Sequence, residues 1–176
     1  MFSVCKSTAD YFGGHAEEAP ARRQYNLLRT TWEELNVPTK EPKCTSPRPA
    51  LDYLGWTFNT ELKFERAAVD GGLQVTKRRL TRYIDGLDAV LASCAASRGV
   101  AERQLCSLVG QVRSTELVFP YLAPWVRRIE YVTAFSADLS RRIIPNRHIQ
   151  DDLRYIRRIL GDPTRNRISF DWLLTR

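Results

Sequence analysis

The sequence predicts an α+β chain that is predominantly helical, with a small antiparallel β-hairpin followed by a helical bundle. Two observations lead to this prediction. Apolar residues recur at helical spacing through most of the chain after residue 72, whereas short β-favouring segments precede it. The 176 residues include 43% apolar and 10% aromatic residues, which is enough to bury a core.

The part before Gly71-Gly72 contains one expected helix and several extended segments. An apolar stripe at spacings of three and four predicts a helix over residues 16–36, with Tyr25, Leu28, Trp32 and Leu35 on one face. Residues 51–58 are rich in β-favouring side chains and predict a strand. Further extended segments are expected at residues 62–69 and 73–75, separated by the turn signal Asp70-Gly71-Gly72.

Four helices are expected after Thr76, which is a candidate N-cap. The first carries an apolar face formed by Leu80, Ile84, Leu87 and Leu91. The others are expected at about residues 101–118, from Pro124 onward, and from an Asn146 cap to Gly161. A final strand is expected at residues 167–170.

Positive charge is concentrated in the second part of the chain. Residues 1–72 hold 9 lysines and arginines against 10 acidic residues, whereas residues 73–176 hold 18 against 10. Such a distribution is expected when one portion rests on a polyanion, although arginines also decorate solvated helix faces. The clustering favours contacts with a phosphate backbone, made foremost by Lys77, Arg78, Arg79, Arg82, Arg127 and Arg128, with Arg141, Arg142, Arg154, Arg157 and Arg158 as further basic points along one groove.

Cysteine and histidine usage excludes several classes of site. The four cysteines are widely spread without a C-x-x-C pair, and the two histidines stand alone, so neither a zinc site nor a disulfide framework is expected. No secretory signal is present at the start, and no apolar run of about 18 residues occurs. We therefore expect an intracellular protein, in the nucleus or cytoplasm, without a membrane partner.

The segment from Leu35 to Trp56 carries the most informative motif. Pro42, Pro47 and Pro49 keep its backbone extended, so that Lys43 is presented on a loop. The loop leads into a short apolar segment that closes on Tyr53-Leu54-Gly55. This order of parts resembles the end of the palm domain of reverse transcriptases, especially the DIRS-like, tyrosine-recombinase branch of retrotransposons, where a lysine-bearing loop runs into a Phe/Tyr-Leu-Gly hairpin. The resemblance implies that this hairpin begins here at Tyr53-Leu54-Gly55.

Two later motifs extend this resemblance over nearly the whole chain. The segment ERQLCSLVGQV, from Glu102 to Val112, is similar to the second thumb helix of the family. Residues 152–155 resemble the segment that leads toward a ribonuclease H domain. The resemblance thus implies a palm C-terminal part at residues 1–72, a thumb-like helical bundle at 73–145, and the start of a connection toward a ribonuclease H domain at 146–176.

The resemblance also implies roles for individual residues. Lys43 would lie near the departing pyrophosphate as a proton donor, and the primer terminus would be gripped by Tyr53, Leu54, Gly55 and Trp56. The alternatives are a solvated loop lysine at position 43, an ordinary strand around Gly55, and a core or hairpin role for Trp56.

The catalytic turn of the family is incomplete in this sequence. The segment STADYFGGH aligns with the Tyr-x-Asp-Asp turn, which places Asp10 at the second aspartate and Ala9 at the first. A shifted alignment makes Asp10 the first aspartate instead. Two-metal catalysis with Mg²⁺ needs several oxygen ligands, and alanine supplies none. The fingers and the remaining palm aspartate would precede Met1, so we expect no polymerisation by this chain alone, unless the remainder of a polymerase acts in trans.

Two hypotheses for function follow. The first is a fragment of a retroelement reverse transcriptase, an RNA-directed DNA polymerase, that retains binding to an RNA–DNA or DNA primer–template duplex. The second is a non-enzymatic basic helical protein that binds nucleic acid or serves as a scaffold. No helix-turn-helix, zinc-finger or RNP pattern predicts sequence-specific recognition in either case.

Overall fold

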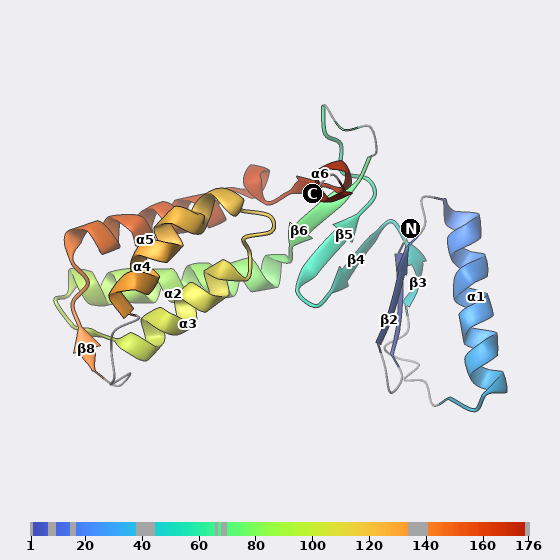
Figure 1. The fold of residues 1–176 in the computed structure, drawn as a ribbon, viewed down its shortest axis with the longest axis horizontal. Helices are drawn as coiled ribbons and strands as arrows, with labels where there is room; N and C mark the ends of the chain where they lie inside the picture. The colour runs from blue at the N-terminus through green and yellow to red at the C-terminus, as the bar shows by residue number, and fades with distance from the viewer. Residues whose placement is uncertain are drawn as a thin grey trace. The chain divides into compact units, whose positions relative to one another are not determined.

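The chain is mixed α/β, with most of its regular structure in helices and the rest in small antiparallel sheets (Figure 1). The computed structural model describes residues 2–6, 10–14, 17–37, 45–65, 67, 70–133 and 141–174. The chain divides into two compact units. The first comprises residues 1–74 and 168–176, and the second comprises residues 75–167. Residues 146–176, expected as one connecting segment, are thus divided between the two units.

A three-stranded sheet and one helix open the first unit. Strands β1 (Phe2–Lys6) and β2 (Asp10–Gly14) form an antiparallel pair, and β3 (Thr45–Arg48) pairs with the other edge of β1. Helix α1 (Glu18–Glu34) packs on this sheet, which confirms the helix expected over residues 16–36. Its apolar stripe is only partly covered, because Leu35 at the C-cap is 68% exposed.

The second sheet of this unit contains a hairpin that the sequence pattern did not separate. The single strand expected over residues 51–58 is two strands, β4 (Ala50–Tyr53) and β5 (Trp56–Asn59), in which Tyr53 pairs with Trp56. Alternation of side chains continues across a two-residue turn, so periodicity alone does not reveal the reversal. The prediction of one strand from periodicity was therefore wrong at Leu54-Gly55, whereas the hairpin that the resemblance implies at Tyr53-Leu54-Gly55 is confirmed.

Two further strands complete this sheet, whose order is β4-β5-β6-β9. Strand β6 (Gly72–Val75) confirms the segment expected at residues 73–75, and it pairs with β9 (Ile168–Ser169). The segment expected at 62–69 forms no strand in its described residues, 62–65 and 67. Gly71 has a φ of 103°, and its N–H donates to the Leu62 carbonyl, so the turn closes a loop rather than a hairpin. The short helix α6 (Phe170–Leu174) follows β9.

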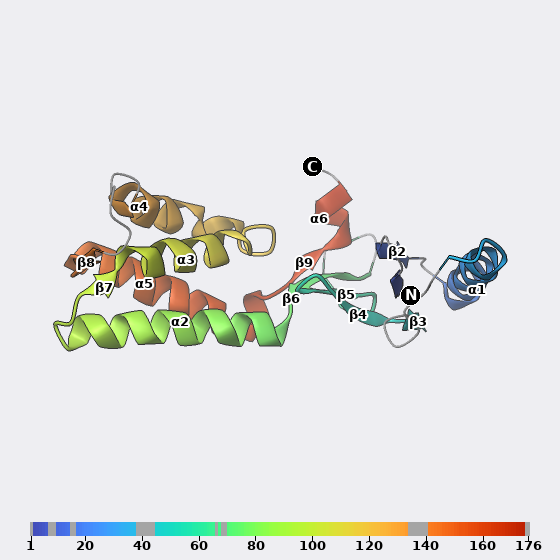
Figure 2. The same cartoon turned by 90° about the horizontal axis from the view of Figure 1, so that it is seen from below.

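The second unit is built on four helices, which are α2 (Lys77–Ala95), α3 (Glu102–Arg113), α4 (Ala123–Thr133) and α5 (Arg147–Leu160). Helix α2 packs on α3 and α5, and α4 packs on the same two helices (Figure 2). The expected thumb-like group held three helices before residue 146, but α5 completes the bundle. A small pair of strands, β7 (Val100–Ala101) and β8 (Arg142–Ile143), joins two of its loops.

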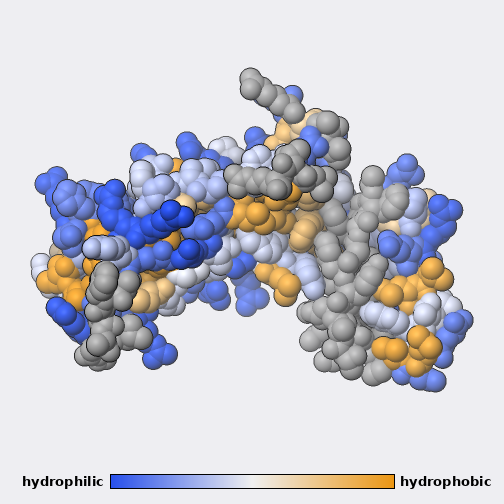
Figure 3. All heavy atoms as spheres, viewed as in Figure 1, coloured by the Kyte–Doolittle hydropathy of each residue, from blue (hydrophilic) through white to orange (hydrophobic). Residues whose placement is uncertain are grey.

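Apolar side chains from all four helices fill the centre of the bundle. Its buried members include Leu87, Leu105, Leu108, Val112, Val126, Ile129, Leu153 and Ile156. On α2 the buried face is rotated from the expected one, because Tyr83, Val90 and Cys94 are buried while Ile84 and Leu91 are only partly covered. The face seen in Figure 3 is mainly hydrophilic over α4. None of the described helices is long and apolar enough to cross a membrane.

The ends of two helices have identifiable causes. The Asn146 side chain accepts a hydrogen bond from the Ile149 backbone N–H, which confirms the expected cap of α5. Helix α3 ends at Arg113 instead of continuing to residue 118. The Ser114 and Thr115 hydroxyls donate to the carbonyls of Gln111 and Val112, and so satisfy acceptors of the last turn.

Candidate nucleic-acid interface

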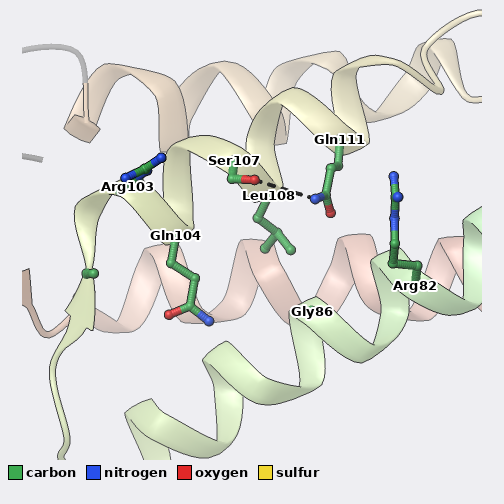
Figure 4. A pocket seen from close by; sticks show the side chains of 8 residues that line it. Arg82, Gly86, Arg103, Gln104, Ser107, Leu108 and Gln111 are labelled. Atoms are coloured by element: carbon green, nitrogen blue, oxygen red, sulfur yellow. Dashed lines mark hydrogen bonds between the residues drawn. The ribbon is translucent and has the colours of Figure 1, made fainter. Parts of the chain in front are cut away.

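A groove lies between α2 and α3 on the helical unit (Figure 4). It has a volume of about 390 Å³, and its described lining consists of Arg82, Gly86, Ala101, Arg103, Gln104, Ser107, Leu108 and Gln111. We call it the α2–α3 groove. Its floor is apolar, whereas its walls carry guanidinium, amide and hydroxyl groups.

Close packing of the two helices forms the floor. Gly86 faces Leu108, and a Cβ atom added to Gly86 would lie 2.9 Å from the Leu108 Cδ1 atom. Real Cβ contacts are longer than this, so glycine permits the observed approach of α2 to α3. Leu108 itself is 4% exposed and belongs to the core of the bundle. The floor of the α2–α3 groove is therefore part of the packed core of the bundle.

The walls of the groove come from one polar face of α3. Arg103, Gln104, Ser107 and Gln111 recur at spacings of one, three and four, opposite the buried face of the helix. The Gln111 side-chain amide donates to the Ser107 hydroxyl over 3.5 Å, a long contact. The polar wall thus offers groups that an incoming ligand can use.

The electrostatic character of the groove is positive. Arg82 contributes from α2 and Arg103 from α3, while none of the described lining residues is acidic. Both arginine side chains are exposed, so they carry their charge to the solvent side of the groove. A concave surface of one charge sign concentrates counter-ions and favours an anionic ligand.

A buried hydrogen-bond network fixes one end of the groove. The Arg79 Nε donates to the Tyr83 hydroxyl over 2.6 Å, and the Arg79 Nη2 donates to the Ser114 hydroxyl over 2.8 Å. Burial raises the pKa of Tyr83, but its hydrogen bonds with Ser114 and Arg79 outweigh burial and hold that pKa below its ordinary value. The Arg82 guanidinium lies 5.3 Å from the centroid of the Tyr83 ring. Arg82 is therefore positioned beside an anchored segment.

The first turn of α2 carries an unusual accumulation of positive charge. Lys77 and Arg78 are exposed there, Arg79 follows, and no acidic residue occupies the turn. The helix dipole disfavours cations at an N-terminus by about 0.3–1 kcal/mol each.

The other predicted arginines do not share one groove. The Arg128 Nε lies 3.3 Å from Asp152 Oδ2 on α5, and Arg157 makes two hydrogen bonds of 2.9 and 3.1 Å to Asp88 on α2. Arg154 pairs with Asp151 at 2.7 Å.

Of the predicted points named above, only Arg82 lines the α2–α3 groove within the described structure. Arg127 and Arg141 are exposed elsewhere, and Arg142 donates to the Gly99 carbonyl. The expectation that one groove lines up these arginines stays a prediction, because acidic side chains engage Arg128, Arg154 and Arg157 but leave each of them about half exposed.

The groove also contains residues that the sequence reasoning missed. That reasoning followed runs of adjacent arginines, whereas Arg103, Gln104, Ser107 and Gln111 are spread over three helical turns. Their signal was the polar face of the segment Glu102–Val112, which lacks acidic side chains after its first residue.

The primer-grip residues lie on the β4–β5 hairpin in the first unit. Leu54 and Gly55 form its two-residue turn with φ values of 51° and 85°, as in a type I′ turn. Leu54 is 70% exposed, while Tyr53 and Trp56 are partly buried. A large apolar residue is both exposed and held in a left-handed conformation at this turn.

The predicted catalytic residues are only partly visible. Asp10 is the first residue of β2, and its backbone faces Lys6 of β1 across the ladder. Lys43 lies outside the described residues. Among the described residues, no group of three or more His, Cys, Asp or Glu side chains is arranged to hold a metal ion. Mg²⁺ binding at Asp10 therefore stays a prediction.

Comparisons with known protein families, with curated proteins and with solved structures find no match to this chain.

Proposed function

We propose that this chain is the C-terminal palm and thumb part of a retroelement reverse transcriptase, and that its helical unit binds the backbone of a primer–template duplex. The observation that carries the proposal is the α2–α3 groove, where arginines from two helices and three hydrogen-bonding side chains meet without a carboxylate. Arginine and amide groups of this kind bind phosphate oxygens and fix the register of a protein on a duplex.

The dimensions of α3 suit a short stretch of duplex. Arg103 and Gln111 are eight residues apart, which corresponds to about 12 Å along a helix. This length equals the axial rise of about three to four base pairs. Their contacts would be made to phosphate and sugar, so we expect binding that depends little on base sequence.

The order of elements in the first unit supports the palm part of the proposal. Strands β1 and β2 come first, helix α1 and strand β3 follow, and the β4–β5 hairpin turns at Leu54-Gly55. The family resemblance implies this order, with the metal-binding turn first and the primer grip last. A strained, exposed Leu54 is also typical of a position selected for contact with a ligand.

Catalysis is not part of the proposed activity of this chain alone. Ala9 stands at the position of the first aspartate, so the turn supplies one carboxylate from Asp10. Primer extension with Mg²⁺ or Mn²⁺ tests this directly, and we expect no nucleotide incorporation. Incorporation that Asp10→Ala abolishes would refute the expected inactivity.

The ion pairs across the bundle favour a second candidate, a non-enzymatic basic helical protein. Arg128, Arg154 and Arg157 are engaged by acidic side chains, so much of the positive charge serves the fold or its surface. Such a protein would bind heparin, single strands and duplexes with similar weak affinity.

Binding to a recessed RNA–DNA duplex, measured by fluorescence anisotropy, separates these candidates. We expect the double variant Arg82→Gln with Arg103→Gln to bind at least about tenfold more weakly, because two charge-assisted contacts are lost. The control variant Arg157→Gln removes an arginine that Asp88 engages, and it should bind almost as well as the wild type. Equal losses in both variants, together with equal affinity for heparin, would favour the second candidate.

A further inference from the structure

Aromatic and arginine side chains gather on another surface of the helical unit, which the duplex proposal does not use. The residues come from the short 3-10 segments η2 (Pro120–Leu122) and η3 (Pro163–Arg165) and from α4 and α5. We call this the aromatic–arginine surface, and its members are Tyr121, Trp125, Tyr155, Arg158 and Arg165.

Ring and cation–π contacts join three of these side chains, Trp125, Tyr155 and Arg158. The Trp125 and Tyr155 rings meet edge to face with centroids 5.1 Å apart, and the Arg158 guanidinium lies 5.2 Å from the Tyr155 centroid. Burial raises the pKa of the Tyr121 hydroxyl, while the neighbouring Arg165 lowers it and Tyr155 contributes to raising it. The effect of Arg165 on this pKa places its guanidinium near the Tyr121 hydroxyl.

The rings of Tyr121, Trp125 and Tyr155 are not needed to fill the core of the bundle. The inward positions of α4 and α5 are occupied by Val126, Ile129, Leu153 and Ile156, each about 1% exposed. Trp125 and Tyr155 are only half-buried, and Tyr121 is 41% exposed. The chain thus places three aromatic side chains where part of each ring meets solvent.

The charge of the surface points to an anionic partner. Arg158 makes no ion pair among the described residues, and it is held over Tyr155. Arg165 is oriented by Asp162, whose carboxylate also accepts from the Thr164 backbone and hydroxyl groups. The surface therefore presents one cation without a carboxylate partner and one oriented cation beside the exposed ring of Tyr121.

We propose that the aromatic–arginine surface binds unpaired nucleotides, with bases stacked against Tyr121 and Trp125 and phosphates at Arg158 and Arg165. Exposed aromatic rings interleaved with arginines form the usual platform for single-stranded nucleic acid, because every base has a flat face and every linkage carries a charge. Paired bases are already stacked within their duplex, so this surface selects unpaired strands. It goes beyond duplex binding in the α2–α3 groove.

Binding of a fluorescein-labelled dT15 oligonucleotide tests this proposal. Tyr121→Leu keeps apolar volume but removes the ring, and we expect about a tenfold loss of dT15 affinity. The same variant should leave the affinity for an abasic strand of equal length unchanged, whereas Arg158→Gln should weaken binding to both. The control is Tyr131→Leu, because Tyr131 is 69% exposed on another face of α4.

A second readout does not depend on the folding of the Tyr121 variant. Stacking of dT15 on Trp125 should quench tryptophan fluorescence of the wild type, and Trp125→Phe should remove most of that quenching. Unchanged dT15 affinity in Tyr121→Leu, an equal loss on the abasic strand, or equally effective competition by polyglutamate would overturn the proposal. The groove variant Arg82→Gln with Arg103→Gln separates the two sites, because its loss should be larger for duplex than for dT15.

Discussion

Gly110 is the residue of α3 whose identity the fold does not explain. It lies on the exposed side of the helix, and a Cβ atom added there would meet no atom within 4 Å. Glycine inside a helix costs about 1 kcal/mol relative to alanine, so packing within the chain gives no reason to retain it. A helix without a side chain at this point can approach a nucleic-acid backbone closely. The proposed binding of a duplex therefore gives a reason for glycine at position 110.

Substitution of Gly110 by alanine should therefore have two opposite effects. We expect Gly110→Ala to raise the free energy of unfolding by about 0.5–1 kcal/mol and to weaken duplex binding. Urea unfolding and anisotropy measure the two effects. Gly86→Ala is the matched control, and it should destabilise the fold because its Cβ would lie 2.9 Å from Leu108 Cδ1. Unchanged duplex affinity in a stabilised Gly110→Ala protein would argue against contact along α3.

Asp152 is the buried carboxylate that contacts a predicted nucleic-acid-binding arginine. It is 8% exposed, and Arg128 Nε lies 3.3 Å from its Oδ2, which accepts no hydrogen bond among the described residues. Burial raises the pKa of Asp152, and Arg128 lowers it less than burial raises it. The folded state therefore holds the Asp152 proton more tightly than the unfolded state does.

The raised pKa of Asp152 determines how this residue makes the free energy of unfolding depend on pH. Below the unfolded pKa of about 4, the protonated Asp152 contributes its full share of stability. That contribution is lost as the pH rises through the higher folded pKa. We expect Asp152→Asn to flatten the stability profile between pH 4 and pH 7 and to raise the urea midpoint at pH 7. A midpoint that falls at pH 7 would instead mean that the pair with Arg128 stabilises the bundle on balance.

At the level of elements, the β4–β5 turn shows how a locally unfavourable residue can mark a site. Leu54 adopts a φ of 51°, a conformation that costs an ordinary L-residue about 1–2 kcal/mol. Asparagine and glycine are the residues that type I′ turns prefer at this position. The turn therefore holds Leu54 in a strained conformation that asparagine or glycine would adopt at a lower free-energy cost.

We expect Leu54→Asn to stabilise the protein by about 1 kcal/mol and to weaken binding to a recessed duplex end. Thermal unfolding and anisotropy with recessed and blunt duplexes are the measurements. Leu54→Ala serves as the control, because it removes the apolar contact and keeps the strained turn. If both variants bind recessed ends as tightly as the wild type does, Leu54 has no role in gripping a primer.

Local signals were sufficient for several elements but not for others. The Asn146 cap and the stripe of α1 depend on neighbouring residues, so the sequence predicted α5 and α1 well. Periodicity extended one strand across Leu54-Gly55, because leucine is not a typical turn former, and the hairpin there was expected only from the family resemblance. The end of α3 depends on the Ser114 and Thr115 hydroxyls, each of which donates to the backbone carbonyl three residues earlier in the chain. Helix propensity does not reveal these hydrogen bonds.

Prediction of the site failed where contacts between helices decide the role of a side chain. Arg157 and Asp88 are 69 residues apart in sequence and form a two-bond pair in the bundle. The neighbouring residues in the sequence do not distinguish Arg157, which pairs with Asp88, from Arg82, which lines the α2–α3 groove. Arg103 was missed because it stands apart from the runs of arginines, although it shares a polar helix face with Gln111.

At the scale of the whole molecule, charge and fold divide along nearly the same boundary. Residues 73–176 carry the excess positive charge, and the second compact unit comprises residues 75–167. The first unit holds the catalytic-turn and primer-grip motifs, and the second holds the α2–α3 groove. The proposed backbone binding would thus belong to one unit and the proposed grip of a strand end to the other, so that separate variants test them.

The salt dependence of duplex affinity is the most direct test of backbone binding in the α2–α3 groove. The logarithm of the binding constant should fall linearly with the logarithm of salt concentration, with a slope of about −0.9 for each phosphate contact on duplex DNA. On that duplex we expect Arg82→Gln with Arg103→Gln to reduce the steepness of this slope by about two, and Arg157→Gln to leave it nearly unchanged. An identical slope for the wild type and the groove variant would show that the α2–α3 groove does not hold the phosphate backbone.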